Sequence, residues 1–125
     1  MQLASIRIIT ADVDRLTTFY EGLLGTPAAR LAPVFSEFRA ATGTLAISAP
    51  ETAGPAAAGT VEPASNRSVI VEFQVDDVDE VFASRRDRLG TVVQEPTTMP
   101  WGNRSLLLLD PDGNLVNLFA PAGGR

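Results

Sequence analysis

The sequence contains no cysteine and no histidine, and all ten of its basic residues are arginine, so lysine is absent as well. Such a chain has no thiolate nucleophile, no lysine for a Schiff base and no imidazole for acid–base chemistry. It cannot form a disulfide, and it cannot build a zinc site of the usual Cys and His ligands. Any catalysis would have to rest on carboxylates, hydroxyls, arginine, backbone groups or the single tyrosine, Tyr20.

Long hydrophobic runs and excess positive charge are also missing. No apolar run approaches the roughly 20 residues of a membrane helix, and the first residues do not resemble a secretory signal, so we expect a cytoplasmic protein. The net charge of −5 argues against nucleic acid as a partner. The same acidity is compatible with a cationic ligand or with ordinary solubility.

What remains is the composition of one globular domain. The chain has 125 residues, of which 45% are hydrophobic and 20% charged. A chain of this length buries roughly two thirds of its unfolded surface. These values are typical of a folded domain rather than a disordered segment.

Two segments of the chain repeat at a spacing of 65 residues (77 − 12). Asp12-Val13-Asp14 recurs as Asp77-Val78-Asp79, and Leu24-Gly25-Thr26 recurs as Leu89-Gly90-Thr91. Apolar residues between these landmarks recur at three- and four-residue spacing, which predicts a helix in each copy. Asp12 and Asp77 are predicted N-caps, and Gly25 and Gly90 are predicted C-caps.

A strand is predicted before each helix. In 69–75 the apolar residues Val71 and Phe73 alternate with Glu72 and Gln74, so the first pair should face the helix and the second pair the other side. At the same 65-residue spacing, the strand 5–9 should turn Ile6 and Ile8 toward the helix and Ser5, Arg7 and Ile9 away from it.

Each half also ends in a strand followed by Ala-Pro, at 44–50 and 114–121. A further strand is predicted at 104–109, joined to the last one by the turn Asp110-Pro111-Asp112-Gly113. The Ala-, Gly- and Pro-rich stretch between the halves reads as a flexible connector. We therefore predict an α+β domain with module one at 1–50, a connector at 51–66 and module two at 67–121.

The order and duplication of these motifs resemble the glyoxalase/bleomycin resistance/extradiol dioxygenase (vicinal oxygen chelate) superfamily. The resemblance rests on Asp12-Val13-Asp14-Arg15, Phe19-Tyr20 and Leu24-Gly25 in the first half, and on Trp101-Gly102 and Asp110-Pro111-Asp112-Gly113-Asn114 near the end. It implies tandem βαβββ modules forming an eight-stranded, curved mixed sheet around a cavity. It also implies metal ligands on the first and last strand of each module in the metal-dependent members.

The positions that correspond to those metal ligands carry Ser5, Ala46, Ile70 and Asn117. Hard cations need several oxygen ligands and softer ones need His or Cys, so this set suits neither class. The sequence therefore resembles the metal-free members, and we expect no metal cofactor. That resemblance implies a homodimer that binds a small organic molecule and sequesters an antibiotic or toxic metabolite.

Arg7 and Glu72 occupy equivalent positions in the two modules (72 − 7 = 65), and we predict an ion pair between them in the cavity. The pair could equally serve only to join the modules. Phe35 and Phe38 are three residues apart on a predicted strand at 34–41, so they should point to opposite faces. Trp101 is either a stacking surface at the rim or a packing residue. The candidate ligand-binding residues are Ser5, Arg7, Phe38, Glu72, Gln74, Trp101 and Asn117.

Two other functions fit the same residues. The first is a metal-independent enzyme of the lyase or isomerase type that uses Glu72, or Tyr20, as an acid–base group. The second is a non-catalytic dimeric scaffold whose cavity is filled by its own side chains. Fold does not fix function, so the sequence leaves these alternatives open.

Overall fold

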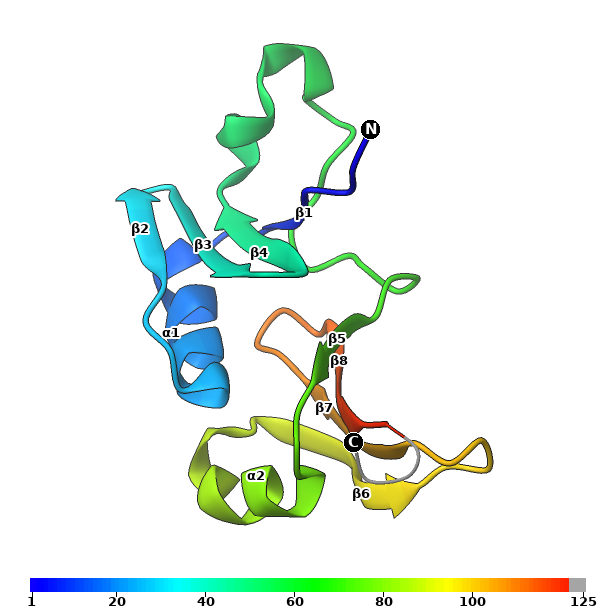
Figure 1. The fold of residues 1–125 in the computed structure, drawn as a ribbon. Coiled ribbons are helices and arrows are strands. Elements are labelled where there is room, and N and C mark those ends of the chain that lie inside the picture. Colours follow the sequence, from blue (N-terminus) through cyan, green and yellow to red (C-terminus); the bar gives the residue numbers. More distant parts are fainter. Residues whose placement is uncertain (122–125) are drawn as a thin grey trace. The chain divides into compact units, whose positions relative to one another are not determined.

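The computed structural model describes residues 1–121, and the chain divides into two compact units, residues 1–65 and residues 66 onward (Figure 1). The first unit contains β1 (Ser5–Ile9), α1 (Val13–Leu24), β2 (Ala29–Ala32), β3 (Phe35–Ala40) and β4 (Gly43–Ser48). The second contains β5 (Val71–Gln74), α2 (Val78–Ser84), β6 (Thr91–Thr98), β7 (Arg104–Leu109) and β8 (Leu115–Ala120).

The two units have the same topology. The strand orders are β1-β4-β3-β2 and β5-β8-β7-β6. In each sheet the first and last strands of the unit pair in parallel, and the other pairs are antiparallel. The helix supplies the crossover that a parallel pair requires. The predicted α+β class and tandem βαβββ modules are confirmed, and the eight strands form two mixed sheets of four strands each.

Helix α1 has the ends that the sequence predicts. The carboxylate of Asp12 accepts a hydrogen bond from the backbone N–H of Arg15 at 3.0 Å. Gly25 ends the helix with a φ of 68°, a left-handed conformation that glycine adopts at little cost. Its N–H donates to the carbonyl of Glu21 at 2.9 Å. Both caps therefore satisfy backbone groups that the helix leaves without partners.

Helix α2 begins as predicted but ends earlier. The carboxylate of Asp77 accepts from the N–H of Glu80 at 3.1 Å. The helix stops at Ser84, so the prediction that Gly90 is its C-cap is wrong. The residues that follow, Arg85–Arg88, carry no apolar side chain that could extend the buried stripe, and a 3₁₀ turn (η3, Arg86–Arg88) leads to the buried Leu89.

Each helix packs on one face of its own sheet. Helix α1 lies against β3 and β4, and α2 lies against β6, β7 and β8. In the first unit Leu16, Tyr20 and Ile47 are fully buried; in the second, Leu106, Leu108 and Val116 are fully buried. Burying each such side chain contributes about 1.5–3 kcal/mol relative to leaving it exposed. Each unit therefore has its own hydrophobic core.

The segment between the modules contains two short 3₁₀ helices, η1 (Pro50–Ala53) and η2 (Pro55–Ala57), and neither has a buried residue. The hydroxyl of Thr52 donates to the Ser48 hydroxyl at 2.8 Å. Near the other end, the side-chain amide of Asn66 donates to Asn114 Oδ1 at 3.1 Å. The first part of the connector thus has local structure, and its last residue belongs to the second unit.

Within residues 1–121, neither helix has the length and apolar character needed to cross a bilayer.

Candidate ligand-binding faces

Each sheet has one face covered by its helix; we call the opposite side the open face. In the first unit the hydroxyls of Thr17 on α1 and Ser36 on β3 are 2.8 Å apart, which identifies the helix side of β3. Ser36 pairs with Ile47 and Ile47 pairs with Ile8, so these residues share that side. The alternate residues Ser5, Arg7 and Ile9 therefore lie on the open face, as predicted.

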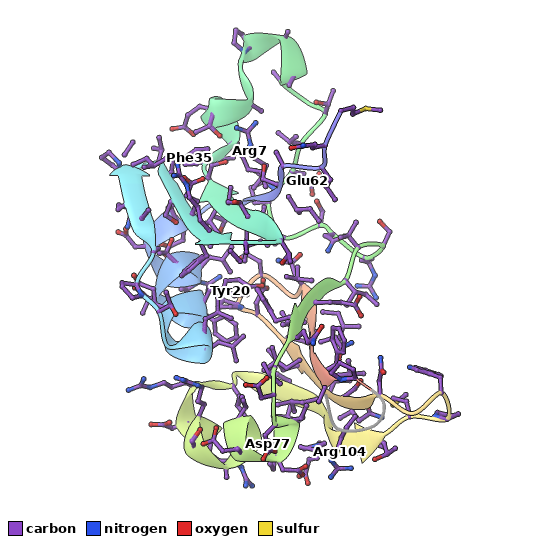
Figure 2. The ribbon with its side chains drawn as sticks, in the orientation of Figure 1. Arg7, Tyr20, Phe35, Glu62, Asp77 and Arg104 are labelled. Atoms are coloured by element: carbon purple, nitrogen blue, oxygen red, sulfur yellow. The ribbon has the colours of Figure 1, made fainter. Side chains whose placement is uncertain are left out.

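The charged groups on the open face of the first unit have partners within that unit. The guanidinium of Arg7 lies 5.9 Å from the centroid of the Phe35 ring, within the range of a cation–π interaction. Figure 2 shows both side chains at the strands of this unit. Arg39 Nε forms an ion pair with Glu37 Oε1 at 2.7 Å. Cations and an aromatic ring thus dominate this surface.

Phe35 and Phe38 point to opposite faces of the sheet, as their spacing predicts. Phe38 pairs with the buried Leu45, and its ring centroid is 6.4 Å from that of Tyr20 on α1. The expectation that Phe38 lines the ligand-binding face therefore has to be corrected, because Phe38 belongs to the helix-side core. Phe35, beneath Arg7, holds the open-face position.

In the second unit the helix side is identified by Arg104 of β7. Its guanidinium forms two hydrogen bonds to the carboxylate of Asp79 on α2, at 2.7 and 2.9 Å. The hydrogen bond from Arg104 holds the pKa of Asp79 below its usual value and raises the pKa of the guanidinium. These perturbed groups lie across the sheet from the open face, so they secure the helix and do not mark a ligand site.

On the open face of the second unit, three polar side chains and one leucine lie in one row across the four strands. Glu72 of β5 pairs with Asn117 of β8, Asn117 pairs with Leu107 of β7, and Leu107 pairs with Gln94 of β6. Paired residues project to the same side of a sheet, so these four side chains form one line. We call Glu72, Asn117 and Gln94 the acceptor row.

One hydrogen bond determines the orientation of this row. Asn117 Nδ2 donates to Glu72 Oε2 at 2.9 Å. A carboxylate only accepts, so the amide must turn its NH₂ group toward Glu72 and its carbonyl oxygen away. Asn117 Oδ1 is buried and has no hydrogen-bond partner within residues 1–121, and the same is true of Gln94 Oε1. The row therefore holds the Glu72 carboxylate and two buried amide oxygens that have no hydrogen-bond partner among the described residues.

Gln94 was not identified as a candidate from the sequence. Val92 pairs with Leu108, so regular antiparallel pairing would place Val93 opposite Leu107. The register instead shifts by one residue, and Gln94 takes that place. A β-bulge moves the following side chains to the other face. No local sequence signal marks this shift, although Pro96 in the middle of β6 is typical of an irregular or edge strand.

The other predicted residues are distributed unevenly. Gln74 is on the open face of the second unit, where it pairs with Phe119. Trp101 lies in the turn between β6 and β7 and is 67% exposed, so its ring is not a packing residue of a core. Tyr20 belongs to α1, and its side chain is fully buried. Of the two acid–base candidates, only Glu72 is on an open face.

The Arg7–Glu72 ion pair would join the two units and stays a prediction.

The four positions expected to hold a metal do not fit one. Ala46 and Ile70 have no donor atom in their side chains, and Asn117 already uses its NH₂ group on Glu72. Ser5 adds one neutral hydroxyl, whereas hard cations take six to eight oxygens, several of them usually from carboxylates. Over residues 1–121, no group of three or more His, Cys, Asp or Glu side chains is placed to bind a metal ion.

Comparison with known proteins agrees with this architecture. The family model described as "Glyoxalase/Bleomycin resistance protein/Dioxygenase superfamily" matches residues 2–118. Among curated proteins, none matches the chain.

Several solved structures have the same fold. A glyoxalase/bleomycin resistance protein/dioxygenase family enzyme from Burkholderia phytofirmans PsJN has a TM-score of 0.83 and 19% identity, over 96% of this chain and 98% of that one. A glyoxalase-related enzyme from Fulvimarina pelagi has a TM-score of 0.80 and 17% identity, over 97% and 88%. A glyoxalase/bleomycin resistance protein/dioxygenase from Nocardioides has a TM-score of 0.77 and 22% identity, over 100% and 86%. Together with the family match, the duplicated sheet and helix topology means that this chain belongs to the glyoxalase/bleomycin resistance protein/dioxygenase superfamily.

Proposed function

We propose that this protein binds a small organic molecule without a metal ion and sequesters it unchanged. The observation that carries the proposal is the substitution of the metal-ligand positions. Where metal-dependent relatives are expected to hold ligands, this chain has Ser5, Ala46, Ile70 and Asn117. A fold of this superfamily without those ligands retains its sheet surfaces and loses the metal-dependent chemistry.

The open faces support binding of an organic ligand. Small-molecule sites combine mainly apolar surface with a few well-placed polar groups. The second unit has that composition, because Leu107, Leu109 and Phe119 share its open face with the acceptor row. The open face of the first unit, taken by itself, has a cation and a ring in Arg7 and Phe35, and Ser5 stands at the start of the same strand as Arg7. On the second unit, Gln74 and the exposed Trp101 are further ligand contacts that we propose.

A thermal-shift screen against antibiotics and aromatic metabolites, with and without divalent cations, tests this proposal. A ligand at about 100 times its Kd stabilises the native state by roughly 2.7 kcal/mol, which raises Tm measurably. We expect at least one compound to raise Tm equally with and without added metal. Stabilisation that requires a divalent cation would contradict metal-free binding.

Sequestration is tested separately from binding. The bound compound is released by denaturation and identified by mass spectrometry after prolonged incubation with the protein. An unaltered mass supports sequestration. A chemically altered product would instead support the acid–base enzyme, and loss of that product in Glu72→Gln would assign the role to Glu72. Light scattering of the native protein, before denaturation, tests the proposed homodimer, which should have twice the mass of one 13.2 kDa chain.

A further inference from the structure

Asn66 stands where the connector meets the second unit, and its side-chain amide bonds in two directions. Its Oδ1 accepts hydrogen bonds from the backbone N–H groups of Ser68 at 3.2 Å and Val69 at 2.9 Å. Its Nδ2 donates to the carbonyl of Val69 at 2.8 Å and to Oδ1 of Asn114 at 3.1 Å. A single amide therefore folds the residues that precede β5 into a turn and ties that turn to the residue before β8.

The bond between Asn66 and Asn114 has a fixed direction. The carboxylate of Asp110 accepts from the backbone N–H of Asn114 at 2.9 Å and from its Nδ2 at 2.7 Å. A carboxylate only accepts, so Asn114 must turn its NH₂ group toward Asp110 and its carbonyl oxygen toward Asn66. Asp110 and Asn114 are both buried. The turn between β7 and β8 thus offers the connector one oriented and sheltered acceptor.

Apolar packing does not hold the entry to β5. Residues 67–70 are all exposed, among them the apolar Val69 and Ile70. Burial begins at Val71, the first residue of the strand. β5 has four residues and stands at the edge of its sheet, where it pairs with β8. A segment with few buried contacts opens easily, so the hydrogen bonds at its ends decide how firmly this strand is held.

The alignment of β5 with β8 determines which side chains meet on the open face. Glu72 pairs with Asn117 and accepts a hydrogen bond from its Nδ2. A shift by one residue would turn Glu72 to the helix side and expose Val71, which is buried. A shift by two residues keeps the faces but moves β5 by roughly 6.6 Å, so that Gln74 or Ile70 takes the place of Glu72.

Backbone hydrogen bonds do not choose between alignments that differ by two residues, because the ladder repeats at that interval. The N–H of Val75 donates to the carbonyl of Phe119 at 2.8 Å, and after such a shift it would meet another carbonyl of β8. The bond from Asn66 to Asn114 has no such replacement, because the same shift would carry the two side chains out of reach of each other. The side-chain bond therefore favours the observed alignment alone.

We propose that Asn66 is a positioning residue for the open face of the second unit: its bond to Asn114 holds β5 in the alignment that places Glu72 beside Asn117. For its role in binding this inference rests on the proposed function, because Glu72 and Gln74 of β5 are candidate ligand contacts. It goes further in assigning a role to the end of the connector, which joins the modules and also fixes the strand that follows.

Amide hydrogen exchange followed by NMR tests this role. In Asn66→Ala the β5 amides that bond to β8 should exchange about fivefold or more faster, whereas the amides of β7 and β1 should change less than about twofold. Asn66→Asp keeps an acceptor for Ser68 and Val69 but has no N–H for Asn114, so it should accelerate β5 as much as Asn66→Ala does. Unchanged exchange in β5 would overturn the inference. Equal acceleration in β5 and β7 would also overturn it, because Asn66 would then stabilise the whole unit without positioning one strand.

Ser65→Ala is the matched control in the neighbouring position. The hydroxyl of Ser65 donates to the carbonyl of Glu62 at 2.7 Å, within the connector. Its loss should leave the exchange of β5 within about twofold of the wild type. Acceleration equal to that in Asn66→Ala would show that any loosening of the connector releases β5, which would overturn the role of the Asn114 bond.

The side-chain amide of Asn117 reports the position of β5 in the same samples. Its NH₂ group donates to Glu72 Oε2 at 2.9 Å, so Glu72→Gln supplies the reference spectrum for loss of that charge-assisted bond. We expect the Asn117 NH₂ resonance of Asn66→Ala to shift in the same direction. An unchanged resonance would overturn the inference, since a variant that is only less stable keeps the wild-type resonance while it is folded.

Neither measurement uses a ligand, so the inference and the proposed function fail separately. A thermal-shift screen that finds no metal-independent compound would contradict the proposed function and leave the role of Asn66 in place. Unchanged β5 exchange in Asn66→Ala would contradict the role of Asn66 and leave metal-free binding in place.

Discussion

The two units of this chain share a fold and differ in the surfaces that their sheets expose. In both, an aspartate caps the helix, a parallel pair joins the first and last strands, and an aliphatic layer faces the helix. On the open faces the equivalent positions have diverged. Arg7 and Ala46 in the first unit correspond to Glu72 and Asn117 in the second (72 − 7 = 65; 117 − 46 = 71). The helix sides of the two units are thus alike, whereas their open faces carry different side chains.

The difference extends to how each helix is held. Asp14 and Asp79 are equivalent (79 − 14 = 65), and each forms an ion pair with an arginine of its own sheet, Arg30 of β2 and Arg104 of β7 respectively. Helix α1 has 12 residues and α2 has seven. The two helices thus differ in length, and the Arg104–Asp79 contact has two hydrogen bonds where the Arg30–Asp14 contact has one.

The largest effect that we predict comes from the helix cores. Leu16 of α1 is fully buried, whereas its equivalent Val81 of α2 (81 − 16 = 65) is only half-buried. Leu16→Ala should lower the free energy of unfolding by about 2–5 kcal/mol, and Val81→Ala by about 1 kcal/mol or less. Urea denaturation followed by circular dichroism measures both. Thr18→Ala, on the exposed side of α1, is the control and should change the value by less than about 0.5 kcal/mol. Equal losses for Leu16 and Val81 would show that the two cores are equivalent.

The helix caps should have a smaller effect that is the same in both units. Asp12 and Asp77 each accept one backbone N–H, at 3.0 and 3.1 Å. Replacing either by alanine should cost about 1 kcal/mol in the same denaturation experiment, because one N–H of the first turn loses its partner. Asparagine retains the acceptor, so Asp12→Asn and Asp77→Asn should be nearly neutral. A loss in one unit only would contradict the equivalence of the two caps.

The predicted Arg7–Glu72 ion pair is tested by a double-mutant cycle. The variants are Arg7→Gln, Glu72→Gln and the pair of them, and the measured quantity is the coupling in the free energy of unfolding. An ion pair between exposed side chains should give a coupling of about 0.2–1 kcal/mol. Additive effects would mean that each residue is held only by its own unit, Arg7 over Phe35 and Glu72 by Asn117.

The smallest effect should be a pH dependence of the stability that the Arg104–Asp79 pair gives to the second unit. Arg104 donates hydrogen bonds to Asp79 and lowers the pKa of that carboxyl below 3.8. The folded state therefore favours the charged form, and the stabilisation is present above pH 3.8 and lost as the pH falls through the lowered native pKa. The difference in Tm between wild type and Asp79→Asn should shrink below pH 3.8. A difference that grows on acidification would contradict this sign. The pair is exposed to solvent, so the shift should be small.

The sequence predicts those parts of the fold whose signals are local. Both aspartate caps, the C-cap at Gly25 and the side-chain alternation of β1 and β5 follow from neighbouring residues, and all of them are confirmed. The sequence predicted the end of α2 too late in the chain. Gly90 has the left-handed φ of a C-cap, 66°, but it follows a 3₁₀ turn and not the helix itself.

The candidate site could be predicted only in part. Alternation along β3 separates Phe35 from Phe38, but the face that each occupies depends on where α1 packs, which the strand itself does not encode. Gln94 joins Glu72 and Asn117 through a bulge in β6, a tertiary feature without a local signal. The polar residues of β5 and β8 were found because those strands are regular.

The central claim is that this chain binds its ligand without a metal ion, and calorimetry after chelation tests it most directly. Protein treated exhaustively with EDTA and then dialysed is titrated with the tightest-binding compound of the thermal-shift screen, in parallel with untreated protein. We predict the same Kd and stoichiometry for both samples. A loss of affinity of about tenfold or more that is restored by adding a divalent cation would contradict the account.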